Sequence, residues 1–259
     1  MSLWSRPAGR VGAVLLTVGV LAVSGPVGGA VAVPGAAAAS CPPTQLAPTR
    51  TAPGPGRRVA LTFDDGASQY TPRILAVLRA ARVRATFFDT GAHDAAHPDW
   101  ARQIAAAGQL LANHSWSHPH LAALTGAAQA AEMDRTSTTQ SLLTGDTPCF
   151  LRPPFGSYDS ATLTAAHARH LAVVMWSVDT GDWHQSAQLS TYWTAFIIQQ
   201  AGLGLRQRHP IVLMHAGKGS TEPEWRVAAE RENTIAALPA IISMYQAAGY
   251  RLVDLTGHT

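Results

Sequence analysis

Two adjacent carboxylates are the first residues of this 259-residue chain that could do chemistry together. Asp64 and Asp65 stand in the segment Thr62-Phe63-Asp64-Asp65-Gly66. Two negative charges so close repel each other, and this repulsion raises the pKa of one carboxyl group unless a positive charge lies nearby. A metal ion on one carboxylate would leave the other free to act as a base. Asp and Gly also favour ordinary turns, so this segment alone does not establish a site.

Two histidines four positions apart, His114 and His118, could share such an ion, because residues at this spacing face one side of a helical turn. The chain has 11 histidines, so a pair like this can also arise by chance. A second pair, His93 and His97, serves as an internal comparison. We expect it in an exposed loop and helix start ahead of Pro98, without a metal.

Short apolar or β-branched runs alternate with longer Ala-rich segments of helical period, which predicts repeated βα units. The predicted strands are 58–63, 85–89, 109–113, 149–152, 171–178, 211–214 and 251–255. The predicted helices are 72–81, 98–107, 127–143, 161–170, 190–201 and 233–247.

Polar residues follow several of these strands directly. They are Asp64, Asp65, His114, His118, Asp179, Asp182 and His215. In a barrel, the carboxyl ends of many parallel strands converge on one face, whereas an open sheet converges only at its switch point. No Gly-rich phosphate-binding loop follows the first strand. The sequence therefore predicts an α/β fold, a distorted (β/α) barrel of about seven parallel strands.

Five short segments in this order resemble the polysaccharide deacetylases, the NodB-homology family of carbohydrate esterases (family 4). They are Thr62-Phe63-Asp64-Asp65-Gly66, His114-Ser115-Trp116-Ser117-His118, Arg152-Pro153-Pro154-Phe155-Gly156, Asp179-Thr180-Gly181-Asp182-Trp183 and Leu213-Met214-His215. The resemblance spans residues 58–255 and implies the same barrel. It also implies one divalent metal ion, usually zinc and sometimes cobalt or nickel.

The resemblance assigns the metal ligands and the base. Asp65, His114 and His118 would hold the ion and leave coordination positions open for water and a substrate oxygen. Asp64 would be the general base. Arg152 would keep Asp64 ionised and oriented.

The resemblance also assigns the remaining catalytic groups. The backbone N–H of Phe155 would stabilise the oxyanion, and His215 would protonate the leaving group. Asp182 would orient His215 and raise its pKa. Three residues would contact substrate, although core packing is an alternative role for them: Trp183, Leu213 and Pro154.

Three positions depart from the commoner family pattern. Phe155 stands where Tyr is frequent, Ala216 where Asp is frequent, and His120 where an acidic residue is frequent. None of these departures removes a predicted ligand or proton-transfer group.

Three functions fit these residues. The first is hydrolysis of N-acetyl groups of GlcNAc-containing glycans, either chitin-like oligomers or peptidoglycan. The second is O-acetyl ester hydrolysis on acetylxylan by the same site. The third is a carbohydrate-binding homologue without turnover, which the presence of Asp64 and His215 disfavours, since binding needs neither a base nor an acid.

The N-terminus has the layout of a secretory signal. Arg6 and Arg10 precede 13 apolar or small residues (11–23), and Ala37-Ala38-Ala39 follows as a cleavage site. An uncleaved membrane anchor and a lipoprotein site at Cys41 are alternatives. We expect a signal peptide at 1–39, a Pro-rich linker at 40–56, a catalytic domain at 57–259, and secretion.

The composition limits the partners. With 47% hydrophobic and 14% charged residues, a packed core is expected. Removing Arg6 and Arg10 leaves 17 basic and 16 acidic residues, a net charge of +1, which does not favour nucleic-acid binding. We expect a glycan substrate, no protein partner and a monomer. Cys41 and Cys149 could form a disulfide in an exported chain, or stay free thiols.

Overall fold

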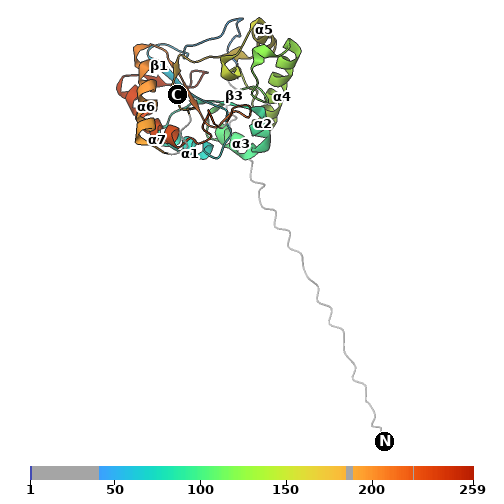
Figure 1. Ribbon diagram of the computed structural model, residues 1–259, viewed down its shortest axis with the longest axis horizontal. Coiled ribbons are helices and arrows are strands. Elements are labelled where there is room, and N and C mark those ends of the chain that lie inside the picture. Colours follow the sequence, from blue (N-terminus) through green and yellow to red (C-terminus); the bar gives the residue numbers. More distant parts are fainter. Residues whose placement is uncertain (2–40, 185–188, 224) are drawn as a thin grey trace, which may run out of the picture. The chain divides into compact units, whose positions relative to one another are not determined.

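The computed structural model describes Met1 and residues 41–184, 189–223 and 225–259 (Figure 1). Apart from Met1, the predicted signal peptide lies outside the described residues. Within the described ranges, no helix combines the length and the apolar character needed to cross a membrane.

Parallel strands form one curled sheet, an incomplete barrel. The strands are β1 Arg58–Asp64, β2 Thr86–Asp89, β3 Leu110–Asn113, β4 Phe150–Leu151, β5 Ala172–Val173, β6 Val178–Asp179, β7 Ile211–His215 and β8 Arg251–Leu252. Seven of them follow the order β5-β4-β3-β2-β1-β7-β6, and β8 pairs with β1. Every one of these pairings is parallel. The predicted fold class is confirmed.

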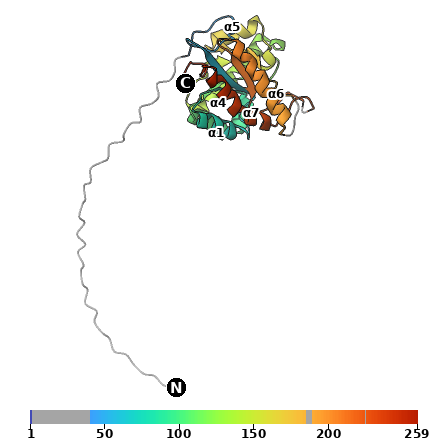
Figure 2. The ribbon, with the colours of Figure 1, turned by 90° about the vertical axis from the view of Figure 1, so that its left-hand side faces the viewer.

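Helices surround this sheet (Figures 1 and 2). They are α1 Thr71–Ala81, α2 Gly91–Ala96, α3 Pro98–Ala106, α4 Gly126–Thr144, α5 Ser160–Ala168, α6 Thr191–Gly202 and α7 Glu232–Ala247. Three short 3₁₀ helices, Leu121–Ala123, Pro154–Gly156 and Leu203–Arg206, lie in the connections. The six predicted helices are all present, and α2 is an additional short one.

Burial of apolar side chains explains why these sequence segments form strands and helices. The strand β1 is buried from Val59 to Asp64, as expected of a parallel strand covered on both faces. Phe63 of β1 stacks on Phe87 of β2, with ring centroids 5.0 Å apart. Helix α1 buries Ile74 and Leu78, which are four residues apart and so lie on one face. This core fixes the positions of the strand ends.

The predicted strand at 171–178 is wrong as a single element, because it is divided between β5 and β6. Strand β5 pairs with β4, whereas β6 pairs with β7, so the two halves belong to opposite ends of the sheet. Val174, between them, forms a bridge with Thr49. The Ser177 N–H donates to the carbonyl of Ile211, and the Ile211 N–H donates to the Ser177 hydroxyl. These two hydrogen bonds place the start of β6 beside β7.

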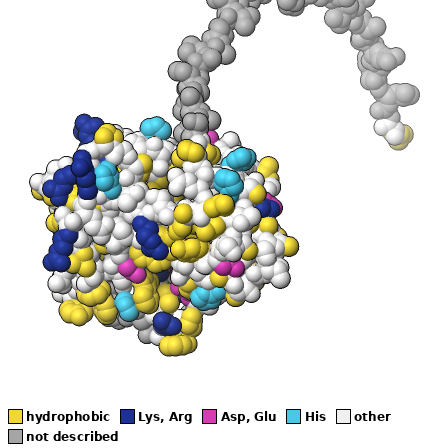
Figure 3. Space-filling model, turned by 90° about the horizontal axis from the view of Figure 1, so that it is seen from above, with side chains coloured by type: hydrophobic (Ala, Val, Ile, Leu, Met, Phe, Trp, Pro, Cys, Tyr) yellow, Lys and Arg dark blue, Asp and Glu magenta, His cyan; other side chains and the backbone are white. Residues whose placement is uncertain are grey.

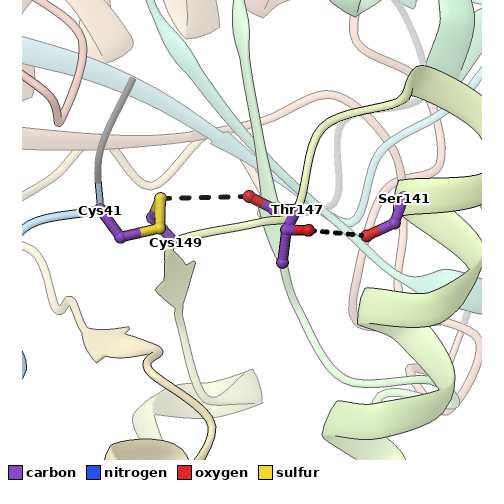
Figure 4. Close-up of a disulfide and its surroundings, with 4 residues drawn as sticks. All are labelled: Cys41, Ser141, Thr147 and Cys149. Carbon is purple, nitrogen blue, oxygen red and sulfur yellow. Dashed lines mark hydrogen bonds between the residues drawn. A yellow bond between two sulfur atoms is a disulfide. The ribbon is translucent and has the colours of Figure 1, made fainter. Parts of the chain in front are cut away.

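The Pro-rich segment 41–56 packs on the domain. Thr49 donates its N–H to Val173 and accepts one from Met175, and Ala52 is buried. Of the two alternatives left open by the sequence, the structure has the disulfide between Cys41 and Cys149, with Cα atoms 5.1 Å apart (Figure 4). The segment is therefore covalently attached just before β4. The predicted boundary between linker and domain stays a prediction.

Removal of this disulfide is expected to destabilise the fold. The bond spans 108 residues of sequence, and closing so long a loop restricts the unfolded chain. The double variant Cys41→Ser/Cys149→Ser should lose about 2–4 kcal/mol of unfolding free energy. Urea unfolding, with and without reductant, measures this loss, and the double variant should not respond to reductant. Equal midpoints for both proteins under oxidising conditions would contradict the expectation.

Candidate active site

The carboxyl ends of the strands bring the predicted residues to one cavity. In the sheet register Asp64 pairs with His215, and Asn113, which precedes His114, pairs with Leu151, which precedes Arg152. The cavity has a volume of about 510 Å³. The predicted residues among its lining are Asp64, Asp65, His114, His118, Phe155, Asp179, Trp183, Leu213 and His215. Three predicted residues are buried and lie outside this lining: Arg152, Pro154 and Asp182.

Asp65, His114 and His118 converge as a buried group. Asp65 Oδ1 lies 3.4 Å from His114 Nε2 and 3.0 Å from His118 Nε2. All the donor atoms lie within 4.8 Å of one another. Neither oxygen of Asp65 meets a well-aligned hydrogen-bond donor among the described residues. Burial alone would raise the pKa of Asp65, but the two imidazoles outweigh it and hold that pKa well below its usual value.

Hydrogen bonds to the far side of each imidazole fix its tautomer. His114 Nδ1 donates to the carbonyl of Arg152 at 2.7 Å. The hydroxyl of Thr221 donates to the carbonyl of His118 at 2.6 Å, so its oxygen accepts from His118 Nδ1, 3.2 Å away. In the neutral form of each imidazole, Nε2 therefore carries the lone pair and is available to a cation beside Asp65. Two imidazole nitrogens and one carboxylate are ligands that suit zinc, and the group fits a divalent cation.

A proton would compete with that cation at His114. Burial by itself would lower the pKa of His114, but Asp64 and Asp65 outweigh it and raise that pKa. Metal ligands must be deprotonated, so acid should weaken binding here.

Asp64 is held by a buried guanidinium. Arg152 Nη1 lies 2.6 Å from Asp64 Oδ1 and 2.9 Å from the hydroxyl of Thr62. Arg152 Nε donates to the carbonyl of Val174 at 3.3 Å, and the side chain is fully buried. Asp64 Oδ2, the other oxygen, lies 3.8 Å from His114 Nε2. Asp64 is thus fixed in orientation beside the Asp65–histidine group.

His215 and Asp182 form a second pair. His215 Nδ1 lies 2.7 Å from Asp182 Oδ1, and the His215 backbone N–H donates to Oδ2 at 2.9 Å. Burial alone would lower the pKa of His215, but the Asp182 carboxylate outweighs it and raises the pKa to about 9. A cation beside Asp65 would offset part of this rise, because the charge of Asp65 also contributes. His215 can therefore hold a proton near neutral pH.

Phe155 lies on the cavity rim with a φ of +58°, a left-handed conformation that is rare outside glycine. It is 43% exposed and stacks on His120, with centroids 4.0 Å apart. His120 also lines the cavity. The stacked pair forms an aromatic surface beside His118, whose ring centroid lies 4.5 Å from that of Phe155.

Several contributors could not be found from the sequence. Thr221 orients His118, and Thr234 donates its hydroxyl to Asp182 Oδ2 at 2.8 Å. Glu222 and Arg226 line the cavity from the segment that follows β7. No spacing signal in the sequence separates these residues from ordinary loop residues or, for Thr234, from the other residues of α7.

The comparison pair of histidines is placed differently from the expectation. His93 lies on α2, half-buried, with Nδ1 2.8 Å from the carbonyl oxygen of Asp65. It is therefore not exposed, and the prediction of an exposed loop was wrong for this residue. His97 is exposed. Neither histidine belongs to the Asp65–histidine group that the described residues form.

The sequence is similar to known polysaccharide deacetylases. Residues 51–174 match the family model described as polysaccharide deacetylase. The chain is 33% identical over 203 residues to a chitooligosaccharide deacetylase of Rhizobium leguminosarum bv. trifolii, covering 77% of this chain and 90% of that protein. This chain belongs to the polysaccharide deacetylase family. A peptidoglycan-N-acetylglucosamine deacetylase of Bacillus cereus is 32% identical over 198 residues, with 76% and 66% covered. Membership of this polysaccharide deacetylase family supports a hydrolase acting on N-acetyl groups.

Solved structures agree with the fold. The peptidoglycan N-acetylglucosamine deacetylase Bc1960 superposes with a TM-score of 0.69 at 31% identity, covering 80% of this chain and 89% of that one. A family 4 carbohydrate esterase from Streptomyces lividans gives 0.64 at 31%, covering 76% and 92%. A family 4 pseudoenzyme from Bacillus anthracis gives 0.68 at 27%, covering 82% and 68%. The polysaccharide deacetylase fold thus occurs in proteins with and without enzymatic activity. Whether a member is active therefore depends on the side chains of its site.

Proposed function

We propose that this protein is a secreted, zinc-dependent deacetylase that hydrolyses N-acetyl groups of GlcNAc-containing glycans, chitin-like oligomers or peptidoglycan, to amine and acetate. The observation that carries the proposal is that Asp64, His215 and the Asp65–histidine group line one cavity. Behind this lining, Arg152 pairs with Asp64 and Asp182 pairs with His215. The relatives named as deacetylases of peptidoglycan or chitooligosaccharides support the substrate class.

Each side chain has one task in this reaction. A divalent cation held by Asp65, His114 and His118 would acidify water and polarise the acetyl carbonyl. Asp64 takes the proton of the attacking water, and Arg152, 2.6 Å from Asp64 Oδ1, holds the carboxylate in its orientation. The backbone N–H of Phe155 stabilises the negative charge on the acetyl oxygen.

The second proton transfer completes the hydrolysis. His215 donates a proton to the leaving nitrogen as the C–N bond breaks, and Asp182 stabilises the imidazolium before that donation. Acetate and a free amine are the products.

Amide hydrolysis is favoured over ester hydrolysis by the state of His215. An amine leaves poorly unless it is protonated, and an acid that keeps its proton near neutral pH meets that need. Asp182 keeps the pKa of His215 high against the effect of burial. A binding protein without turnover would need neither this pair nor the Asp64–Arg152 pair.

Acetate release from three substrates tests the proposal. Chitooligosaccharide, peptidoglycan and acetylated xylan are incubated side by side with the purified protein, with and without a chelator. We expect release from at least one of the first two substrates and loss of release with the chelator. Release from acetylated xylan alone would favour the esterase, and no release from any substrate would favour the binding protein.

The pH profile offers a separate prediction. Asp182→Asn should move the alkaline limb of kcat/KM to lower pH by roughly one to three pH units. Burial alone would lower the pKa of His215 and Asp182 raises it to about 9, so the unaltered enzyme loses this proton as pH rises toward that value. Without the carboxylate, burial dominates and the proton leaves at lower pH. An unmoved limb in rates measured across this range would contradict the role of Asp182.

Export is supported by two observations. The N-terminal arginines and apolar run have the layout of a signal peptide, and the Cys41–Cys149 disulfide suits an oxidising compartment. N-terminal sequencing of protein from the culture medium should begin near residue 40. Intact Met1 on cell-associated protein would contradict this part of the proposal.

The surface also suits an uncharged glycan. Figure 3 shows several Lys and Arg side chains along the left edge of the face in view and single ones at its centre, lower end and right edge, separated by hydrophobic side chains and by uncharged polar or backbone atoms. A continuous basic surface for a polyanion is not seen on that face.

A further inference from the structure

The short helix α2 joins the two loops that carry the Asp65–histidine group. Its first residues, Gly91 and Ala92, donate their backbone N–H groups to the carbonyls of Ser115 (3.0 Å) and Trp116 (3.1 Å), between His114 and His118. The next residue of the same helix, His93, contacts the other loop. Six residues of helix therefore contact both sources of ligand atoms.

His93 contacts the turn that presents Asp65. Its Nδ1 lies 2.8 Å from the carbonyl oxygen of Asp65 and 3.0 Å from that of Gly66. Carbonyl oxygens only accept, so His93 Nδ1 carries the hydrogen and is shared between the two. The contact bears on the backbone of the turn and leaves the Asp65 carboxylate free to face the imidazoles.

The turn needs such support. Asp65 has a φ of +67°, in the left-handed region that costs free energy for a non-glycine residue. Beside it, a Cβ added to Gly66 would lie 1.5 Å from Asp89 Oδ1, so the backbone packs directly on a buried side chain. A donor that holds both carbonyls opposes relaxation of this backbone.

The helix itself is anchored in the core. Asp94, the neighbour of His93, is buried and accepts a hydrogen bond of 2.9 Å from Gln140 of α4. Gln140 also donates to the carbonyl of Ala112 in β3 at 3.0 Å. His93 therefore projects from a fixed support, which is what a positioning contact requires.

We infer that His93 is a positioning residue of the metal site, holding the Asp65–Gly66 turn so that the Asp65 carboxylate meets both imidazoles. The inference rests on the metal site of the proposed function. It predicts that loss of the Nδ1 donor weakens metal binding without removing any ligand.

Zinc affinity of the full-length protein tests this, measured by competition with a chromophoric chelator, without substrate. His93→Leu removes the donor and keeps the bulk, and should weaken zinc binding roughly 10- to 100-fold. His93→Asn, of nearly the same shape as Leu, restores an N–H donor and should bind zinc much as the unaltered protein does. The exposed His97 provides the control, since His97→Ala should change nothing. The absorption spectrum of bound cobalt should change in His93→Leu and not in His93→Asn.

The zinc affinities of the two His93 variants decide whether the Nδ1 donor supports the metal site. Equal zinc affinities of the Leu and Asn variants, whether both are tight or both are weak, would overturn the inference. Thermal unfolding in chelator verifies that each variant is folded. If His93→Leu does not fold, His93→Asn decides by itself, because affinity well below that of the unaltered protein would contradict a donor role. Failure of the unaltered protein to bind zinc would instead contradict the proposed function.

Discussion

Asp64→Asn is expected to abolish nearly all acetate release while the metal stays bound. The variant keeps an oxygen that can accept from Arg152, which lies 2.6 Å from Asp64 Oδ1, but it cannot take a proton from the attacking water. Loss of a general base costs roughly 10²- to 10⁴-fold in rate. Acetate release and metal content are measured on the same preparation.

The neighbouring carboxylate provides the matched comparison. Asp65→Ala removes a ligand of the Asp65–histidine group and should lose both the metal and the activity. The two variants alter adjacent residues at the end of one strand, so a difference in metal content separates their roles. Normal turnover by Asp64→Asn would contradict the mechanism.

The second large effect is expected at His215, and it depends on the leaving group. His215→Ala should slow hydrolysis of the N-acetyl glycan roughly 10²- to 10⁴-fold, because the amine can no longer be protonated as it departs. An aryl acetate has a leaving group that departs without a proton. Its hydrolysis should therefore be far less affected.

Rates for both substrates on the same His215→Ala preparation verify this expectation. The aryl acetate serves as the internal control for folding and for metal binding, since the variant keeps Asp65, His114 and His118. An equal loss on both substrates would contradict a role for His215 as the acid and would indicate a general disturbance of the cavity.

Much of the site could be predicted because its chemistry stands at strand ends. Asp64 and His215 directly follow predicted strands that are far apart in the sequence, and the parallel register of β1 and β7 places the two residues side by side. A run of buried β-branched residues that ends in a polar residue is visible in one sequence. The convergence of such ends follows from the barrel architecture.

What the sequence does not reveal depends on tertiary contacts. The apolar run at 171–178 shows no break, because the change from β5 to β6 is set by which neighbour each half pairs with. His93 and His97 have the spacing of the true pair, and only the place of α2 beside the Asp65 turn gives His93 a contact. Thr221 and Thr234 orient the site through single hydroxyl groups.

Zinc-dependent deacetylation is measured directly as the release of acetate and free amine from an N-acetylchitooligosaccharide, by purified, chelator-treated protein to which zinc is added back. We expect no products without metal, and acetate and amine in equal amounts once about one zinc per chain has bound. Full activity in the metal-depleted protein, or no products from the zinc-loaded protein on chitooligosaccharide and on peptidoglycan, would contradict a zinc-dependent deacetylase.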